Sequence, residues 1–144
     1  LQCDPAMADT AVFCAHYGIA PIDSANTIVI ASKKPKGTFV ACVALATTRL
    51  DVNRVVKREM GVSRLSFASA EQTVALTGMM VGGVTPPGLP PEIPLLVDAR
   101  VMAREHVVIG GGSRSTKIRV GPALFRALPN CRIVNDLAYE WSGS

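Results

Sequence analysis

The stretch TGMMVGGVTPPGLPPEIP, residues 77–94, interrupts a chain that otherwise reads as alternating strands and helices. Glycine permits positive φ and the close approach of another backbone or a ligand, whereas proline fixes φ and removes a hydrogen-bond donor. A flexible linker would instead be dominated by Gly and Ser, without interleaved apolar residues. The stretch therefore predicts a rigid, non-repetitive loop, which is either a stiff structural turn or part of a ligand site.

Ordered elements flank this loop on both sides. Before it, Ser69 can cap a helix over residues 70–78, and after it residues 93–101 supply a strand that ends near Asp98. Further out, the apolar patterns predict helices over residues 5–18, 50–61 and 121–130, and Asp51 is the expected N-cap of the second. They also predict a hairpin of strands 24–32 and 37–46. Further strands are expected over 64–69, 106–112 and 117–120, and residues 131–138 form a closing segment. Because strands and helices do not alternate regularly, we expect one α/β (α+β) domain over residues 1–144, with a mixed, mostly antiparallel sheet surrounded by helices.

Composition narrows the class of protein. The 144 residues are 49% hydrophobic and 18% charged, as in soluble globular proteins, and they suffice to bury a core without disulfides or a metal. The net charge of +4 favours a polyanionic partner over a cationic one. Since no apolar run approaches the roughly 18 residues that span a bilayer, we expect no membrane partner. The N-terminal LQCDPAMADT has neither a basic n-region nor an apolar h-region, so we expect no signal peptide, and the scattered cysteines favour a reducing, cytoplasmic location.

The cysteines and histidines form no metal-binding pattern. The four cysteines include no CxxC pair, and His16 and His106 are far apart in the sequence. We therefore expect neither a zinc site nor any other cofactor. The order of Ser, Cys, His and Asp residues also gives no sign of a covalent mechanism.

Two glycine-rich segments each follow an apolar run. They are GGVTPPG, residues 82–88, and GGGSRS, residues 110–115. Both should lie at the ends of core elements, where they can face each other across a cleft and aim backbone N–H groups at a carbonyl or a phosphate. Neither has the spacing of a phosphate-binding loop or of a dinucleotide-binding turn, so ATP and NAD are not expected.

The order of these features resembles the YbaK/ProX family, the aminoacyl-tRNA deacylases that also occur as editing domains of bacterial prolyl-tRNA synthetases. The resemblance runs from about Asp9 to Ala138. It is carried by LDVNRVVKREMG, by ASAEQTVALTGMMVGGVTPPGLP, by LLVDARV with Asp98, and by VVIGGGSRSTKIRV. The most specific parts are the Thr-Gly before the loop, the Gly-Gly-Val-Thr-Pro-x-Gly loop, and the Gly-Gly-x-Arg segment.

The resemblance implies hydrolysis of the ester between a wrong amino acid and the terminal ribose of a tRNA, because a synthetase pocket rejects small differences only roughly 10–200-fold. The implied partners are the tRNA acceptor end and an aminoacyl-tRNA synthetase. The implied catalytic positions are Asn26, Gly82 and Gly83, with both glycine amides near the scissile carbonyl. The implied substrate-binding positions are Thr27, Thr77, Gly78, Thr85, Pro86, Gly88, Asp98, Gly110, Gly111 and Gly112. The edited amino acid, the tRNA and the oligomeric state stay open.

Asn26 departs from the family pattern. Family members that deacylate usually carry a lysine there, in a Lys-Ser/Thr-aliphatic pattern, where this chain reads SANTIVIA. Asparagine can orient a carbonyl or a water, but it brings no positive charge to an anionic intermediate, and one lost stabiliser costs a few kcal/mol. The turn lysines Lys33, Lys34 and Lys36 are candidate substitutes. The alternatives are a changed substrate, a weakened enzyme, or a non-catalytic module that binds an aminoacyl or other small acyl ligand.

Other polar residues have two interpretations each. Asp98 either contacts the substrate's amino group or caps the helix-like segment ARVMAR that follows it. Arg114, Lys117 and Arg119 either bind phosphates of the tRNA acceptor end or form a solvated strand face. We expect His106 to be structural.

Overall fold

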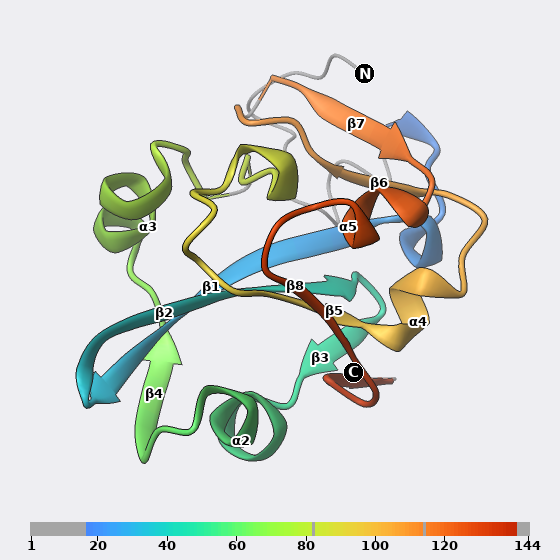
Figure 1. Ribbon diagram of the computed structural model, residues 1–144. Coiled ribbons are helices and arrows are strands. Elements are labelled where there is room, and N and C mark those ends of the chain that lie inside the picture. The colour runs from blue at the N-terminus through green and yellow to red at the C-terminus, as the bar shows by residue number, and fades with distance from the viewer. Residues whose placement is uncertain (1–16, 82, 114, 141–144) are drawn as a thin grey trace.

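The computed structural model describes residues 17–81, 83–113 and 115–140 (Figure 1). The strands are β1 (Ala25–Lys34), β2 (Lys36–Leu45), β3 (Thr48–Leu50), β4 (Arg64–Phe67), β5 (Leu95–Asp98), β6 (Val107–Gly110), β7 (Lys117–Val120), β8 (Cys131–Val134) and β9 (Ala138–Glu140). The helices and helical turns are η2 (Pro21–Asp23), η3 (Val52–Val56), α2 (Lys57–Met60), α3 (Ala70–Thr77), η4 (Pro86–Gly88), α4 (Ala99–Met102) and α5 (Ala123–Arg126). None of these helices is long and apolar enough for a membrane crossing.

The central sheet has the strand order β4-β1-β2-β5-β8. Its β4–β1 and β1–β2 pairs are antiparallel, whereas β2–β5 and β5–β8 are parallel. Two small antiparallel ribbons, β3–β9 and β6–β7, accompany it. The predicted mixed, mostly antiparallel arrangement with surrounding helices is confirmed.

The β1–β2 hairpin forms the centre of the fold. Its register runs from the Ala25–Leu45 pair toward the turn at Lys33 and Lys36. The middle of both strands is buried, so each strand reads as a nearly continuous apolar run instead of an alternating one. The predicted hairpin is therefore confirmed, and it is a buried one.

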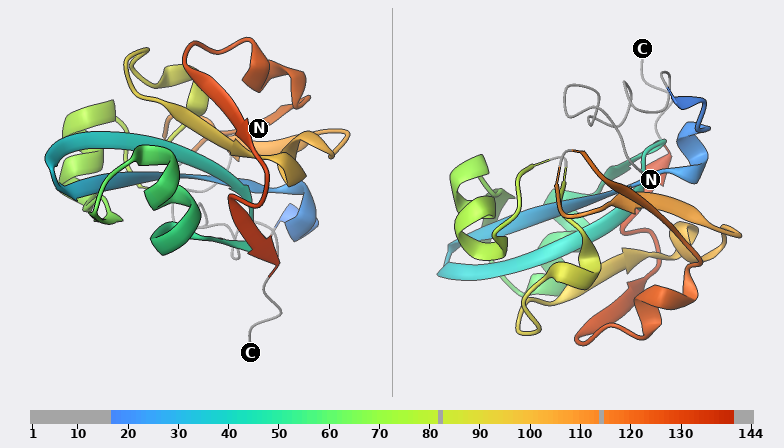
Figure 2. Two further views of the ribbon diagram at one scale, coloured as in Figure 1. Left: turned by 60° about the horizontal axis from the view of Figure 1, so that its bottom comes forward. Right: turned by 90° about the horizontal axis from the view of Figure 1, so that it is seen from above.

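Two apolar clusters pack on opposite faces of the sheet. On one face, Val43 and Val97 meet β6 and α5 through Ile109 and Phe125. The members of the opposite cluster include Ile30, Cys42, Leu96, Val134, Val55 and Val56. Figure 2 accordingly shows α2 on one side of the hairpin and α5 with β6–β7 on the other. Both faces are covered, which is why the sequence is rich in apolar residues.

Helix α3 begins and ends as the sequence predicts. Gln72 N donates to Ser69 Oγ at 3.0 Å, and Ser69 N donates to Gln72 Oε1 at 2.9 Å, which makes a reciprocal capping box. The helix ends at Gly78, whose φ of 73° is left-handed. The helix therefore has a defined direction as it leads into the glycine-rich loop.

The helix predicted over residues 50–61 is present but begins differently. Its first turn, η3, is π-helical, and Asp51 makes no side-chain cap. Asp51 has φ −86° and ψ 75°, outside the extended geometry of a capping residue, and its carboxylate accepts instead from Arg54 Nε at 3.2 Å. The predicted cap is wrong, whereas the predicted end at Gly61, with φ 67°, is confirmed.

Two further predictions have different outcomes. The helix over residues 5–18 lies outside the described residues, except for its end, where Gly18 has φ 70°. The strand expected over residues 106–112 forms β6 but ends at Gly110, and it touches the central sheet through one parallel bridge, Ser24 with Val108. That bridge brings the second glycine-rich segment beside the hairpin.

Candidate functional site

The two glycine-rich segments lie in direct contact. Gly112 N donates to Gly83 O at 2.7 Å. A Cβ atom at Gly83 would lie 2.8 Å from the carbonyl carbon of Ser113, and one at Gly110 would lie 2.3 Å from Val84 O. Another backbone occupies the space of a side chain at both positions, which only glycine tolerates. The structure thus brings the segments together by packing, and not across an open cleft.

We call Gly83, Gly110, Gly111 and Gly112 the glycine cluster, and its amides are used inside the protein. Gly83 N donates to Met80 O at 2.9 Å, and Gly111 N donates to Thr116 O at 3.0 Å. The turn itself takes the Gly83 amide here, and the expected role of that amide toward a substrate carbonyl stays a prediction. Gly82 and Arg114 lie outside the described residues.

The other residues predicted around the loop hold its shape. Thr77 Oγ1 donates to Thr73 O at 2.7 Å and accepts from Met79 N at 3.0 Å, so it ends α3. Gly78 supplies the left-handed φ at that end. Gly88 N donates to Thr85 O at 3.0 Å in η4, which begins at the buried Pro86. These contacts account for the Thr-Gly and Pro-Pro-Gly parts of the motif without a ligand.

Asn26 lies beside the glycine cluster. Ser24 and Val108 form a parallel bridge. Two residues further along both strands, Asn26 on β1 therefore comes level with Gly110 on β6. The side chains of laterally aligned residues point to the same face of a sheet, and the missing Cβ of Gly110 points at Val84 O. Asn26 and the loop at Val84 therefore share one face of β1 and β6.

Lys117 is the charged residue that pairs with Gly110, the residue level with Asn26. It pairs with Gly110 in the β6–β7 ribbon and is only 7% exposed. The expectation of a solvated or phosphate-binding Lys117 on an open strand face is therefore wrong, whereas Arg119 is exposed as expected. Composition gave no sign of this burial, because alternating Lys-Ile-Arg-Val reads as a half-exposed strand.

The turn lysines cannot replace the charge missing at Asn26. Lys33, Lys34 and Lys36 are exposed at the far end of the hairpin. Lys33 follows Asn26 by seven residues along one strand, a separation of roughly 23 Å at about 3.3 Å per residue. Their predicted role as substitutes is wrong because the extended strand holds them away.

Asp98 is fully buried at the end of β5 and does not cap α4. Its carboxylate lies 3.6 Å from Arg100 Nη1, which also donates to Ala138 O at 2.7 Å. Burial raises the pKa of the Asp98 carboxyl, and the nearby Arg100 guanidinium opposes that rise. The predicted capping is wrong, because the side chain turns to the guanidinium two residues on.

Asp98 is aligned with Asn26 across the sheet. Asn26 pairs with Ala44 on β2, and the parallel β2–β5 register brings the residue after Val97 level with Ala44. Asn26 and Asp98 thus occupy one row with the small Ala44 between them, about 10 Å apart at two strand spacings. Asp98 belongs to the same face as Asn26 but not to the glycine cluster.

Two predicted site residues carry buried hydroxyl groups that lack a hydrogen-bond partner among the described residues. They are Thr27 Oγ1 on β1 and Thr85 Oγ1 before η4. Such a group normally finds a partner, so each is a candidate to contact a ligand. Among the described residues no group of three or more His, Cys, Asp and Glu side chains could hold a metal ion.

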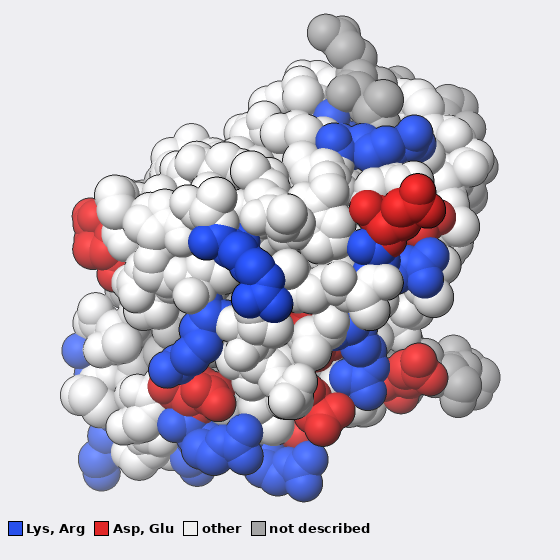
Figure 3. Space-filling model, turned by 45° about the vertical axis from the view of Figure 1, so that its right-hand side comes forward, with Lys and Arg blue, Asp and Glu red and all other residues white. Residues whose placement is uncertain are grey.

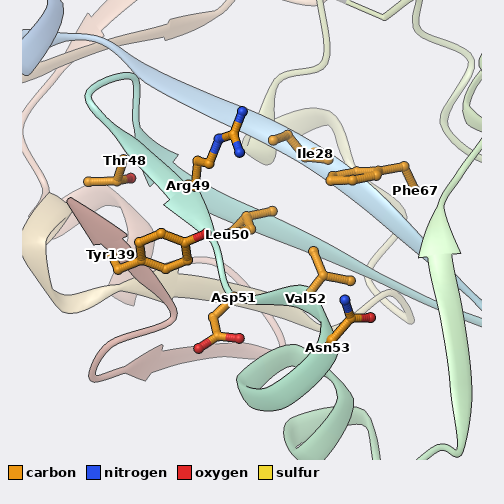
Figure 4. Close-up of a pocket in the computed structure, with 9 residues that line it drawn as sticks. All are labelled: Ile28, Thr48, Arg49, Leu50, Asp51, Val52, Asn53, Phe67 and Tyr139. Carbon is orange, nitrogen blue, oxygen red and sulfur yellow. The ribbon is translucent and has the colours of Figure 1, made fainter. Parts of the chain in front are cut away.

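An open pocket lies next to Asn26 on the same face of β1. Its wall includes Ile28, two residues after Asn26, and its volume is about 520 Å³. Figure 4 shows Phe67 from β4 and Tyr139 from β9 on opposite sides of it. We call it the aromatic pocket, and no sequence motif indicated it, because its residues come from β1, β3, β4, β9 and η3.

These features, a mixed sheet with a glycine-rich loop packed on the hairpin, define an editing-domain fold. Residues 4–128 match the aminoacyl-tRNA editing domain family. The chain therefore belongs to this family, and the resemblance seen in the sequence is confirmed.

Two solved structures show how closely the fold agrees. The hypothetical protein APE2540 is 28% identical, with a TM-score of 0.80, and the match covers 92% of this chain and 85% of that one. A candidate trans-editing enzyme for prolyl tRNA synthetase is 20% identical, also with a TM-score of 0.80, over 94% of this chain and 83% of that one. The second likeness supports the fold alone.

Proposed function

We propose that the protein hydrolyses mischarged aminoacyl-tRNA as a trans-editing deacylase of the YbaK/ProX type. The observation that carries the proposal is the alignment of Asn26, the Gly110 backbone and the buried Lys117 on neighbouring strands. Asn26 stands where the related deacylases carry a lysine, and the buried Lys117 lies two strand spacings away, about 10 Å, across Gly110. The substrate implies a cytoplasmic location and work alongside a synthetase, with prolyl-tRNA synthetase as the first one to test.

The reaction needs few groups. A water oxygen adds to the ester carbonyl carbon, the bond from that carbon to the ribose oxygen breaks, and the ribose oxygen takes a proton. The Asn26 amide donates to the carbonyl oxygen as negative charge develops on it, and Lys117 supplies a positive field across Gly110. The hydroxyl of Thr85 is available to orient the water or the amino acid, whereas Thr27 points to the face of β1 opposite Asn26. The remaining rate enhancement comes from holding the water and the ester in a reactive orientation, to which the neighbouring ribose hydroxyl contributes.

A second function has specific support. The Gly83 amide is engaged within its turn, and position 26 carries no charge, so the oxyanion site is weaker than the resemblance implies. A module that captures an aminoacyl or other small acyl ligand needs only complementarity. This binding module is the alternative to the deacylase.

The experiment is a deacylation screen against a panel of mischarged tRNAs, with release of each amino acid as readout. Wild-type turnover of at least one substrate supports the deacylase. Binding of a non-hydrolysable aminoacyl-adenosine analogue without any release supports the binding module.

Two substitutions then test which residue supplies the positive charge that stabilises the anionic intermediate. If Lys117 supplies it, Lys117→Met lowers kcat by up to about 100–1,000-fold, the cost of one lost stabiliser, and Asn26→Lys restores part of the loss. The matched control is Arg119→Met, since Arg119 lies on the same strand but is exposed. Equal rates for Lys117→Met and the control would exclude Lys117 from the reaction.

A further inference from the structure

The aromatic pocket exposes two rings that a folded chain would normally cover. The Phe67 side chain is 59% exposed and Tyr139 is 46% exposed. They stand on either side of the pocket in Figure 4, with Ile28 from β1 between them and above. Two aromatic faces presented to solvent around one hollow offer stacking surfaces for a flat ring.

Polar groups of the pocket match a nucleotide, in which a neutral base is joined to a negatively charged phosphate. Arg49 pairs with Tyr139 across the β3–β9 ribbon, and both side chains line the pocket, with the Arg49 guanidinium directed toward Ile28 in Figure 4. Asn53 adds an amide that can donate to and accept from the edge of a base. The acidic residue of the wall, Asp51, is ion-paired with Arg54 at 3.1 Å, so its charge is compensated.

A second hollow of about 220 Å³ lies beside the first. Asn53 borders both, and the second is also lined by Lys57, Ser63 and Arg64. Together the hollows carry three basic side chains, Arg49, Lys57 and Arg64, against the one paired acid. Elsewhere in the view of Figure 3, acidic and basic side chains lie interspersed on the surface. Aromatic platforms that lead into a basic groove are the pattern of single-stranded nucleic-acid sites.

We propose that these neighbouring hollows bind a short single-stranded RNA segment, with one base stacked at Phe67 and Tyr139 and the phosphates of preceding nucleotides at Lys57 and Arg64. The identity of that RNA rests on the proposed function: it is the unpaired 3′ end of the tRNA substrate. Ile28 follows Asn26 by two residues on the same face, a separation of about 7 Å along the strand. A nucleotide held in the pocket therefore brings its ribose, and the ester on it, to Asn26.

The first test measures binding without hydrolysis. Fluorescence anisotropy with a labelled tetranucleotide that ends in CCA and carries no amino acid should show saturable binding to the full chain. The double variant Phe67→Leu with Tyr139→Leu should lose about tenfold or more in affinity, since each stacked base contributes about 1–3 kcal/mol. Phe67→Trp keeps a ring and should keep the affinity. Val74→Ala, an exposed apolar site on α3, is the control and should bind like wild type.

The second test separates the phosphate contacts. A plot of log affinity against log salt concentration should become less steep by about 1.4 in Lys57→Gln with Arg64→Gln, because each phosphate contact with a single strand contributes about 0.7 to the slope. Arg126→Gln, exposed on α5, should leave the slope unchanged. An unchanged slope in the double variant would remove Lys57 and Arg64 from the RNA site and overturn the proposal.

The inference and the proposed function fail separately. If wild type binds the tetranucleotide through the aromatic pocket but releases no amino acid from the mischarged panel, the RNA site stands and the deacylase does not. If the leucine double variant binds RNA as tightly as wild type and keeps its kcat/KM on charged tRNA, the RNA site is wrong while the deacylase stands. Unfolding midpoints close to wild type establish that the variants are folded.

Discussion

The glycine cluster and the aromatic pocket both lie beside β1, and they are built in opposite ways. In the glycine cluster, backbone packs on backbone, and the amides of Gly83, Gly111 and Gly112 bond within the protein. In the aromatic pocket, Phe67 and Tyr139 leave much of their surface exposed. The difference teaches that a distinctive motif can mark how a loop is held, while contacts available to a ligand come from side chains that no motif marks.

The largest effect is expected where the cluster is tightest. Gly110→Ala would bring Cβ to 2.3 Å from Val84 O, a backbone atom that cannot turn aside. We expect it to lower the free energy of unfolding by roughly 3 kcal/mol, as overpacking does, measured by urea denaturation. Gly121→Ala is the control, because a Cβ there meets nothing within 4 Å. Wild-type stability for Gly110→Ala would mean that the cluster is loosely packed.

A second prediction concerns how stability depends on pH through Asp98, which lies on the same face of the sheet as Asn26. Its raised pKa means that the folded state holds the proton more tightly than the unfolded state. The ionised carboxylate therefore lowers the free energy of unfolding at pH values above the folded pKa. This loss disappears below the pKa of the unfolded state, which is near 4. Asp98→Asn should therefore be more stable than wild type at pH 7 by about 1–2 kcal/mol. Arg100 keeps Asp136 at 3.5 Å and Ala138 O as partners in that variant.

The control for this prediction is the pH dependence itself. The stability difference between Asp98→Asn and wild type should shrink as pH falls from 7 to 3.5. A variant that is less stable than wild type at pH 7 would show that the ion pair with Arg100 outweighs the cost of burial.

A smaller effect is expected at the helix that leads into the glycine cluster. Ser69→Ala removes the oxygen that accepts from Gln72 N, and loss of such a cap costs about 1 kcal/mol. Thermal unfolding should show the loss. Ser66→Ala, on β4, is the control, since the Ser66 hydroxyl contacts only the adjacent Phe67 carbonyl, at 3.4 Å. A loss of deacylation larger than the loss of stability would link α3 to the site.

The smallest effect on stability is expected in the aromatic pocket. Phe67→Leu changes a side chain that is mostly in solvent, so the free energy of unfolding should shift by less than about 0.5 kcal/mol. Differential scanning calorimetry can measure it. A loss near that of Gly110→Ala would show that the ring supports the fold, and the contrast between the two regions would disappear.

Local patterns predicted most of the elements. The buried hairpin, the Ser69 capping box and the glycine ends of α3 and α2 follow from apolar runs and turn residues that act over a few positions. The π-helical turn η3 was not predictable, since the Asp51 cap pattern is the same for either helix type. The separate β6–β7 ribbon was also missed, because a strand sequence does not state which edge it joins.

The candidate site was predicted less well than the fold. The sequence indicated Asn26 and both glycine-rich segments, but it gave no reason for Lys117 to be buried or for the Gly83 amide to be occupied. Those facts depend on the Ser24–Val108 bridge, which joins residues far apart in the chain. The aromatic pocket was missed for the same reason, as its residues come from five elements.

The sequence by itself determined the family, the mixed α/β architecture and the rigid glycine-proline loop, because periodicity, capping and turn chemistry are local properties. Tertiary structure decided which groups meet. It placed Lys117 two strands from Asn26, across Gly110, held Lys33 and Lys34 at the far end of the hairpin, and opened a pocket between β4 and β9. The physical reason is that strand pairing fixes neighbours by register between distant segments, and one sequence read alone does not contain that register.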